Sequence, residues 1–293
     1  MVKNTKNADK IRLFYFARIQ NFGDILNLDI FDKIFGIEIA KNSGKKGDIV
    51  AIGSLLQVFV VKPHKVFKFL KYRLFYPRIL VWGSGFIEPA AGKNMLSRRL
   101  DVRACRGLLT LERLEKMCGA KVAENVVIAD PGILASRLFD TSKIKKKYAL
   151  GIIPHYLDKG DDLLKKIKVK NSVVIDIQQS PESFMKQLAQ CKSVIASAMH
   201  GLIAADSLGI PNMRMIVTDK ITGGDYKFDD YYSAFGIKNH NRVNLNKRGF
   251  TDKDLPGIKS GYNISKKKIT ELQDALIACF PYKKAGSRIV PWR

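Results

Sequence analysis

The strongest constraint on the fold is a repeated alternation between short apolar runs and amphipathic helical patterns. Runs rich in β-branched and aromatic residues predict strands at residues 11–18, 48–52, 79–82, 101–105, 126–129, 148–153, 172–177, 193–197 and 213–217. Helical patterns separate these runs, for example at 25–35, 107–118 and 199–208. Because strands that alternate with helices favour parallel sheets built from βαβ units, the sequence predicts an α/β fold.

A lysine-rich break at residues 142–148 divides the predicted strands into two series. A chain of 293 residues is long enough for two such units. We predict two doubly wound, Rossmann-like lobes, an N-terminal lobe over residues 1–145 and a C-terminal lobe over residues 146–264. Residues 265–293 are expected to form a helix and a tail that pack back across both lobes. Since such folds bind ligands at the carboxyl ends of their strands, the active site is expected in the cleft between the lobes.

Charge is the unusual feature of the composition. The chain has 51 Lys and Arg against 27 Asp and Glu, a formal net charge of +24, which creates a strongly positive field. Nucleic acid, an anionic membrane surface, a small acidic substrate or an ordinary lysine-rich surface could each account for it. The sequence contains no helix-turn-helix, zinc-finger or RNP-type pattern, so we expect no nucleic-acid partner.

Residues 57–78 (QVFVVKPHKVFKFLKYRLFYPR) concentrate this positive charge. They contain six Lys or Arg and no acidic residue, with large apolar residues between the cations. On a helix this pattern is typical of a basic amphipathic surface that contacts anionic lipid headgroups. A core helix with a solvated lysine face is the alternative. We predict peripheral contact between this segment and an anionic membrane.

The sequence indicates no membrane span, secretory leader or metal site. No stretch of about 18 uninterrupted apolar residues is present, and the lysine-bearing start lacks the apolar region of a secretory leader. The cysteines form no CxxC pair and are interpreted as small buried apolar residues: Cys105, Cys118, Cys191 and Cys279. We therefore expect a cytoplasmic protein, peripheral at the inner face of the membrane, that uses no metal.

His200 is the most informative candidate for chemistry. It lies in residues 193–211 (SVIASAMHGLIAADSLGIP), after a predicted buried strand and at the start of a helix. A helix N-terminus attracts anions, and a histidine can accept or donate a proton near neutral pH. A helix-capping or core histidine is the alternative. We predict that His200 is a catalytic acid or base in the cleft.

Two glycine-bearing turns also follow predicted strands. In residues 21–24 (NFGD), Asp24 either caps the next helix or binds a ligand group. The turn Gly83-Ser84-Gly85 is expected to expose backbone amides to a bound anion, although loop geometry alone explains it equally well. It is not a GxGxxG dinucleotide motif, and the sequence has no P-loop.

Arg103 and Arg106 lie at the end of the predicted strand 101–105. A guanidinium there can bind a carboxylate or a phosphate through two parallel hydrogen bonds, and a surface ion pair is the alternative. Asp130 and His155 each follow a strand in a proline-bearing turn, where turn geometry alone is a sufficient explanation.

Taken in order, these segments resemble the polysaccharide pyruvyl transferase family. The resemblance covers about residues 11–235 and rests on NFGDILN, AIGSLL, VWGSGF, RACRGLLT, ADPGIL, GIIPHYLD, SAMHGLIAADSLGIP and GGDYKFDDYYSAFG. It implies a two-lobed fold related to the GT-B glycosyltransferases. It also implies transfer of pyruvate from phosphoenolpyruvate, the donor substrate, onto two hydroxyls of a sugar. The product would be a cyclic ketal on a cell-surface polysaccharide or on its lipid-linked precursor.

The resemblance further implies roles for individual residues. The family's essential histidine corresponds to His200 and its arginine to Arg106. Cys105 stands where a β-branched residue is usual, so whether Arg103 or Arg106 points inward stays open. Donor-binding residues are expected to be Lys220, with Lys227 as an alternative, Arg103, Gly83, Ser84, Gly85 and Met199. Acceptor-binding residues are expected to be Asn21, Asp24, Asp130 and His155. We expect no cofactor besides the donor substrate.

Two other functions stay open at this point. A GT-B-type glycosyltransferase would need groups that bind a sugar nucleotide in the C-terminal lobe, where Glu182 is the only nearby candidate. A non-catalytic protein that binds nucleic acid or a membrane would act through its charge of +24 alone.

Overall fold

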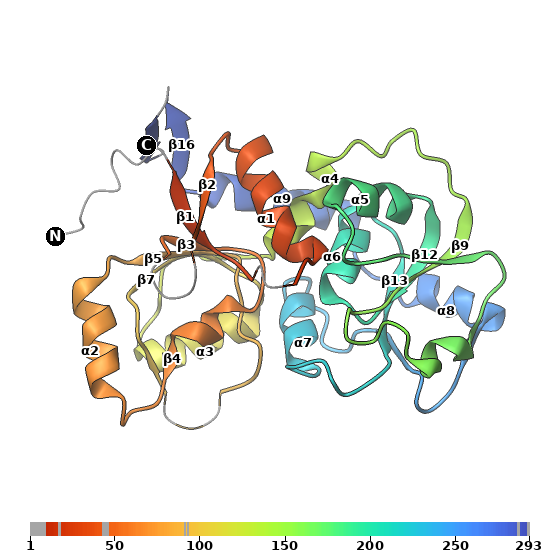
Figure 1. Ribbon diagram of the computed structural model, residues 1–293, viewed down its shortest axis with the longest axis horizontal. Helices are drawn as coiled ribbons and strands as arrows, with labels where there is room; N and C mark the ends of the chain where they lie inside the picture. The colour runs from red at the N-terminus through yellow and green to blue at the C-terminus, as the bar shows by residue number, and fades with distance from the viewer. Residues whose placement is uncertain are drawn as a thin grey trace.

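The computed structural model describes residues 10–16, 19–42, 47–90, 92, 94–285 and 288–291. Two parallel sheets form its centre (Figure 1). The first has six strands, in the order β2 (Ile39–Asn42), β1 (Ile11–Phe14), β3 (Ile49–Val50), β5 (Ile79–Trp82), β7 (Leu100–Cys105) and β8 (Val127–Ile128). The second has five, in the order β11 (Ser172–Val174), β9 (Tyr148–Ile153), β12 (Cys191–Ala196), β13 (Asn212–Ile216) and β14 (Arg242–Asn244). The predicted α/β fold with parallel sheets is confirmed.

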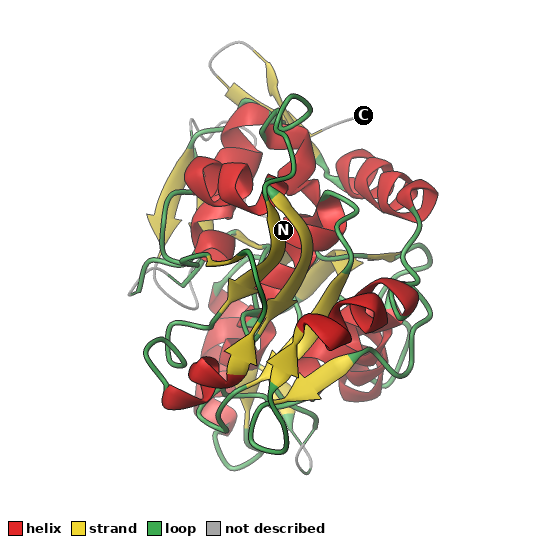
Figure 2. Ribbon diagram, turned by 90° about the vertical axis from the view of Figure 1, so that its right-hand side faces the viewer, coloured by secondary structure: helices red, strands yellow, loops and turns green. Residues whose placement is uncertain are grey.

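Helices pack around the strands of both sheets (Figure 2). They are α1 (Phe22–Lys33), α2 (Val66–Phe75), α3 (Leu108–Cys118), α4 (Ala135–Leu138), α5 (Pro181–Ala189), α6 (Met199–Ser207), α7 (Tyr226–Ser233), α8 (Leu255–Ser260) and α9 (Lys266–Cys279). Short strand pairs join β4 (Val60–Val61) to β6 (Met95–Leu96), β10 (Ile167–Lys168) to β15 (Phe250–Thr251), and β16 (Tyr282–Ala285) to β17 (Arg288–Pro291). Among the described residues, no helix combines the length and apolarity that a membrane span requires.

Local sequence explains where several helices begin and end. Asn21 precedes α1, and its side chain accepts a hydrogen bond from the backbone amide of Gly23. Ser180 caps α5, and Pro181 occupies the first helical position, where its missing N–H has no cost. Helix α3 ends at Gly119, whose φ of +70° is a conformation that favours glycine.

The chain reverses the direction of strand addition once in each sheet. After β1 it adds β2 on one side and then β3 on the other; after β9 it adds β11 on one side and then β12 on the other. A reversal of this kind opens a crevice at the carboxyl ends of the two strands that flank it. The fold therefore offers one crevice between β1 and β3 and another between β9 and β12.

One apolar core joins the two sheets. Its buried members come from β1 and β5, from β9 and β12, and from helices α1 and α6. Phe22 of α1 stacks against Phe184 of α5, with ring centroids 4.3 Å apart. Helix α9 follows the second sheet along the chain but packs on the first, where the indole nitrogen of Trp82 donates to the carbonyl oxygen of Leu276. The two crevices are thus held in one packed unit.

Candidate active site

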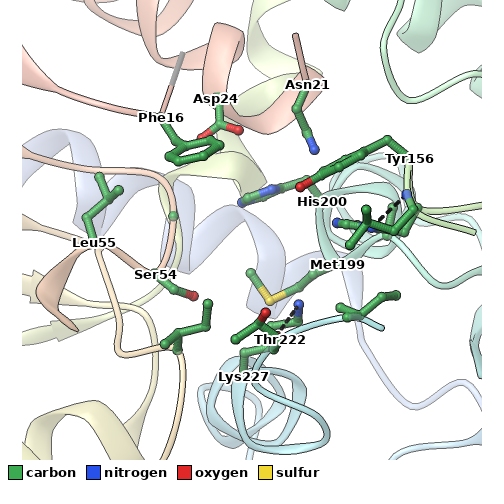
Figure 3. A pocket seen from close by; sticks show the side chains of 16 residues that line it. Phe16, Asn21, Asp24, Ser54, Leu55, Tyr156, Met199, His200, Thr222 and Lys227 are labelled. Carbon is green, nitrogen blue, oxygen red and sulfur yellow. Dashed lines mark hydrogen bonds between the residues drawn. The ribbon is translucent and has the colours of Figure 1, made fainter. Parts of the chain in front are cut away.

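A cavity of about 320 Å³ lies where the two crevices meet (Figure 3). The segments that follow β1, β3, β9 and β12 all contribute to its wall. Its lining residues are Phe16, Asn21, Asp24, Gly53, Ser54, Leu55, Ile87, His155, Tyr156, Leu157, Ala198, Met199, His200, Ile221, Thr222 and Lys227. Since four strand ends converge on it, this cavity is the candidate site for ligand binding and chemistry.

His200 is the second residue of α6, and its ring is fixed by two glycines from elsewhere in the chain. A Cβ atom added to Gly23 would lie 2.1 Å from Nδ1 of His200, and one added to Gly132 would lie 3.7 Å from Cδ2. The imidazole therefore rests directly on the first turn of α1. Its Nε2 atom is shielded from solvent and has no hydrogen-bond partner. A buried polar atom without a partner is costly, so Nε2 is the atom at which a ligand is expected.

The charge state of His200 differs from the sequence-based expectation. Burial lowers the pKa of this histidine to about 3, and the positive charges of Arg106 and Lys227 lower it further. The imidazole is therefore neutral at pH 7, not close to half protonated. A neutral imidazole can accept a proton, and a bound anion beside it would raise its pKa again.

Positive charge reaches the cavity from α7 and from the start of α6. Lys227 lines the wall, with its Nζ atom donating to the carbonyl oxygen of Thr222 at 3.1 Å. Burial and the charge of Arg106 lower the pKa of Lys227 to about 8. Helix α6 begins after Ala198, whose side chain forms no capping hydrogen bond. An ammonium group and an uncapped helix N-terminus on one cavity both favour an anionic ligand.

His155 is held by a hydrogen-bonded chain that joins three loops. Its backbone amide donates to Oγ of Ser197, which donates at 2.6 Å to one carboxylate oxygen of Asp158. Thr218 donates to the other oxygen of Asp158, also at 2.6 Å. Burial lowers the pKa of His155 to about 4. Asp158 was not among the predicted site residues, although it lies in the same turn after β9 as His155.

Asn21 and Asp24 bring the start of α1 to the cavity. Burial raises the pKa of Asp24 to about 7, so a substantial fraction of this carboxyl group is protonated at neutral pH. Figure 3 shows Asp24 on the α1 side of His200 and Lys227 on the opposite side of Met199. The cavity thus combines a neutral base with a protonated carboxyl group, an arrangement suited to moving protons. Among the described residues, no group of three or more His, Cys, Asp or Glu could hold a metal ion.

Comparison with known proteins decides the family. The family model of polysaccharide pyruvyl transferase matches residues 5–218. The chain belongs to this family. Its similarity to the succinoglycan biosynthesis protein ExoV of Rhizobium meliloti (strain 1021) extends over 218 residues at 24% identity, covering 74% of this chain and 62% of ExoV.

Two further similarities are to proteins whose printed names give no activity. An uncharacterised protein, L143, of Acanthamoeba polyphaga mimivirus is 37% identical over 139 residues, which cover 45% of this chain and 47% of L143. The chain therefore spans about half to three fifths of the length of these curated relatives. A crystal structure of a functionally uncharacterised protein from Klebsiella pneumoniae subsp. pneumoniae NTUH-K2044 is 15% identical, covers 76% of this chain and 87% of that chain, and has a TM-score of 0.42.

Arg106, which the resemblance predicted to be a catalytic arginine, points inward but does not line the cavity. It forms a fully buried ion pair with Asp230 of α7, with Nε and Oδ2 2.8 Å apart. Its other nitrogens donate to Oγ of Ser54 at 2.7 Å and to the carbonyl oxygen of Phe86. Arg103, within β7, is exposed and pairs with Asp101. Arg106 therefore holds α7 and Ser54 beside the cavity, and Arg103 lies outside it.

The Gly83-Ser84-Gly85 turn does not offer free amides, so this expectation was wrong for both glycines. The amide of Gly83 donates to the carbonyl oxygen of Ala104, and that of Gly85 donates to the carbonyl oxygen of Gly53. Ser84 is buried and binds the same carbonyl through its hydroxyl. These residues are small because side chains on neighbouring elements occupy the space around them: a Cβ at Gly83 would lie 2.2 Å from a ring carbon of Pro131.

Three other predicted residues also lie off the cavity wall. Lys220 is exposed, with its Nζ atom 3.9 Å from a carboxylate oxygen of Asp161, so Lys227 is the lysine that lines the cavity. Asp130 is buried, does not line the cavity and accepts a hydrogen bond from the amide of Gly132. Glu182 is exposed. Several wall residues were not predicted, including Phe16, Ser54, Tyr156 and Thr222. The first three lie within four residues of the ends of β1, β3 and β9, and Ser54 and Tyr156 also belong to the segments AIGSLL and GIIPHYLD, so position after a strand and these segments were the available signals.

Proposed function

We propose that this protein transfers pyruvate from phosphoenolpyruvate onto two hydroxyls of a sugar and so forms a cyclic ketal. The observation that carries the proposal is the partnerless Nε2 atom of His200 in a cavity that also holds Lys227. Membership of the polysaccharide pyruvyl transferase family supports it. The printed name of ExoV, a succinoglycan biosynthesis protein, supports a polysaccharide as the acceptor. We propose a cell-surface polysaccharide or its lipid-linked precursor.

The donor fits the charges on the cavity wall. Phosphoenolpyruvate carries a phosphate and a carboxylate, which need cations or backbone amides in a partly buried site. Lys227 supplies the cation, and the first turn of α6 at Met199 supplies amides whose partial charge is positive. We place the donor across these groups, with the reacting double bond between His200 and Asp24.

The first step adds the acceptor to the donor. Asp24, in its protonated form, gives a proton to the methylene carbon of phosphoenolpyruvate, and the electron pair of the double bond forms the new C–H bond. The neutral imidazole of His200 takes the proton from the first acceptor hydroxyl, whose oxygen bonds to C2. The opposite pKa shifts of these two side chains suit these two roles.

The second step closes the ring. The C2–O bond to phosphate breaks, and protonated His200 gives its proton to the departing phosphate. The second acceptor hydroxyl bonds to C2, and its proton returns to Asp24. Each hydroxyl has lost one proton, the methylene carbon and the phosphate have each gained one, and the products are the ketal and inorganic phosphate. The charge of Lys227 stabilises the leaving phosphate, so these residues carry the reaction without a further cofactor.

The position of the acceptor, the location of the reaction and the movement of two lobes are also part of this proposal. We place the acceptor against Asn21 and His155, which both line the cavity, and the reaction on the cytoplasmic side of the membrane. The two sheets would act as the two lobes of a GT-B-like fold, with boundaries near residues 145 and 264, and the cavity between them would close on both substrates.

The proposal is tested by incubating the protein with phosphoenolpyruvate and candidate glycan acceptors. The expected product is a glycan whose NMR spectrum contains a ketal methyl signal, formed in step with released phosphate. A glycosyltransferase would instead be stabilised against heat by UDP- or GDP-sugars and not by phosphoenolpyruvate. That pattern, without phosphate release, would overturn the proposal.

A further inference from the structure

Helix α2 (Val66–Phe75) presents large apolar side chains to water. Phe67 is 92% exposed, Phe75 is 78% exposed and Leu74 is 67% exposed. Leu70, one turn after Phe67, is also exposed. In Figure 1, α2 lies at the edge of the molecule, at the far end of the long axis from the second sheet. Exposed apolar residues that cluster on one helix mark an interaction surface.

The other side of α2 is the one that packs on the protein. Phe69, Tyr72 and Tyr76 are partly buried, and the rings of the two tyrosines lie 5.1 Å apart. The guanidinium of Arg98 lies over the ring of Tyr76. Because this side is anchored, the orientation of Phe67, Leu70 and Leu74 toward water is imposed by the fold.

A basic groove adjoins the helix. It is a cavity of about 220 Å³ lined by the exposed cations Arg73, Arg78, Arg99 and Lys121, together with buried Arg98 and apolar residues of β6 and β7. No acidic residue lines it, and no ion pair joins the four exposed cations to another described residue. These four cations form the basic groove.

We infer that α2 and the basic groove form a membrane-docking surface that binds anionic phospholipid headgroups. The cations complement the lipid phosphates in charge, and Phe67, Leu74 and Phe75 insert into the boundary between headgroups and acyl chains. Lys65 and Lys71 are exposed on the same segment and add to the positive surface. This inference goes beyond the proposed function, since it concerns a surface that does not line the catalytic cavity.

The apolar residues favour a membrane over a nucleic acid. A polyanion that binds through its phosphates needs cations alone. The bases of a single strand can stack on exposed phenylalanines, but they have no comparable use for the aliphatic side chains of Leu70 and Leu74, which are also turned toward water. A lipid surface uses both kinds of residue together. The length of α2, 10 residues, suits a helix that lies on the surface and is too short to cross the bilayer.

The test is co-sedimentation of the full chain with vesicles of phosphatidylglycerol and phosphatidylcholine, compared with vesicles of phosphatidylcholine alone. One variant reverses two cations of the groove, Arg73→Glu and Arg78→Glu. A second removes the apolar contacts through Phe67→Ser and Leu74→Ser. A control reverses two exposed lysines of the second half, Lys247→Glu and Lys259→Glu. Each variant is also assayed for phosphate release with a soluble acceptor, so that loss of fold is separated from loss of docking.

We expect the wild type and the control to bind the anionic vesicles. The charge variant should bind at least about 20-fold more weakly, since each basic residue near an anionic surface contributes about fivefold. The apolar variant should also lose binding while keeping its rate with a soluble acceptor. If the control lost as much vesicle binding as the charge variant, the binding would depend on net charge alone, which would overturn the inference. Full vesicle binding by the apolar variant would show that the apolar residues do not insert, and would also overturn the inference. Binding of single-stranded RNA, measured in parallel on the wild type, would then identify a general polyanion site.

Discussion

Gly23 at the start of α1 lies directly against the imidazole of His200 at the start of α6. A Cβ atom at position 23 would lie 2.1 Å from Nδ1, closer than any real pair of atoms in van der Waals contact. The two residues follow strands of different sheets, β1 and β12. The position of the candidate catalytic base is therefore set by a backbone segment from the other half of the chain.

Replacement of Gly23 by alanine is expected to displace His200. The substitution should lower the free energy of unfolding by about 1–3 kcal/mol, as overpacking does. The rate of phosphate release should also fall, even under conditions in which the variant is still folded. Urea denaturation and initial rates measure the two effects. The control is Gly257→Ala in α8, where a Cβ atom would have no neighbour within 4 Å. If Gly23→Ala behaves like this control, His200 does not depend on the contact.

The buried ion pair between Arg106 and Asp230 predicts that Arg106 stabilises the folded protein. Arg106→Met leaves a carboxylate buried without its partner and should lower the free energy of unfolding by about 3–5 kcal/mol. Arg103→Ala breaks an exposed pair and should cost less than about 1 kcal/mol. Both values come from urea denaturation. An Arg106→Met protein of normal stability with a greatly raised KM for phosphoenolpyruvate would instead assign Arg106 to the donor.

Lys227 and Lys220 are expected to differ in their effect on donor binding. Lys227→Met removes a cation from the cavity wall and should raise the KM for phosphoenolpyruvate by roughly 10- to 100-fold, the range for a lost charged hydrogen bond. Lys220→Met changes an exposed side chain and should leave KM unchanged. Steady-state kinetics at varied phosphoenolpyruvate measure both. A raised KM in Lys220→Met together with an unchanged KM in Lys227→Met would instead place the donor site at Lys220.

The raised pKa of Asp24 predicts a pH dependence. Since the protonated form gives the proton, kcat/KM should be level below pH 7 and fall as the pH rises through about 7. Above about pH 8, Lys227 also loses its charge, which should raise the KM for the donor. Asp24→Asn should lower kcat and abolish the first fall while keeping the second. Asp32→Asn, on the exposed side of α1, serves as the control. A profile of Asp24→Asn that parallels the wild type would exclude Asp24 as the acid.

Much of the fold follows from the sequence because buried parallel strands are continuous apolar runs. The predicted strands 79–82 and 148–153 coincide with β5 and β9. The edge strands β2 and β14 were missed, since their sequences, IAKN and RVN, carry Lys, Arg and Asn where one side of the strand has no neighbour.

The site was less predictable because sequence position does not show which partner a side chain has. Arg103 and Arg106 are three residues apart, yet the ion-pair partner of Arg106 is Asp230 on α7, which no local pattern could indicate. Gly83 and Gly85, after β5, are compatible either with free backbone amides or with close packing against other elements. The close approach of Pro131 to Gly83 shows that packing is the reason for the glycine there. The position of His200 on the cavity wall was predictable, since it lies in the first turn of a helix that follows a buried strand.

The rate of phosphate release by His200→Ala tests the central claim most directly. The wild type, His200→Ala and His64→Ala, whose exposed histidine lies outside the cavity, would be compared at saturating phosphoenolpyruvate and a soluble acceptor. We expect His64→Ala to match the wild type and His200→Ala to release phosphate about 10²- to 10⁴-fold more slowly, the contribution of a general acid–base group. Release by a folded His200→Ala protein at the wild-type rate would contradict the account.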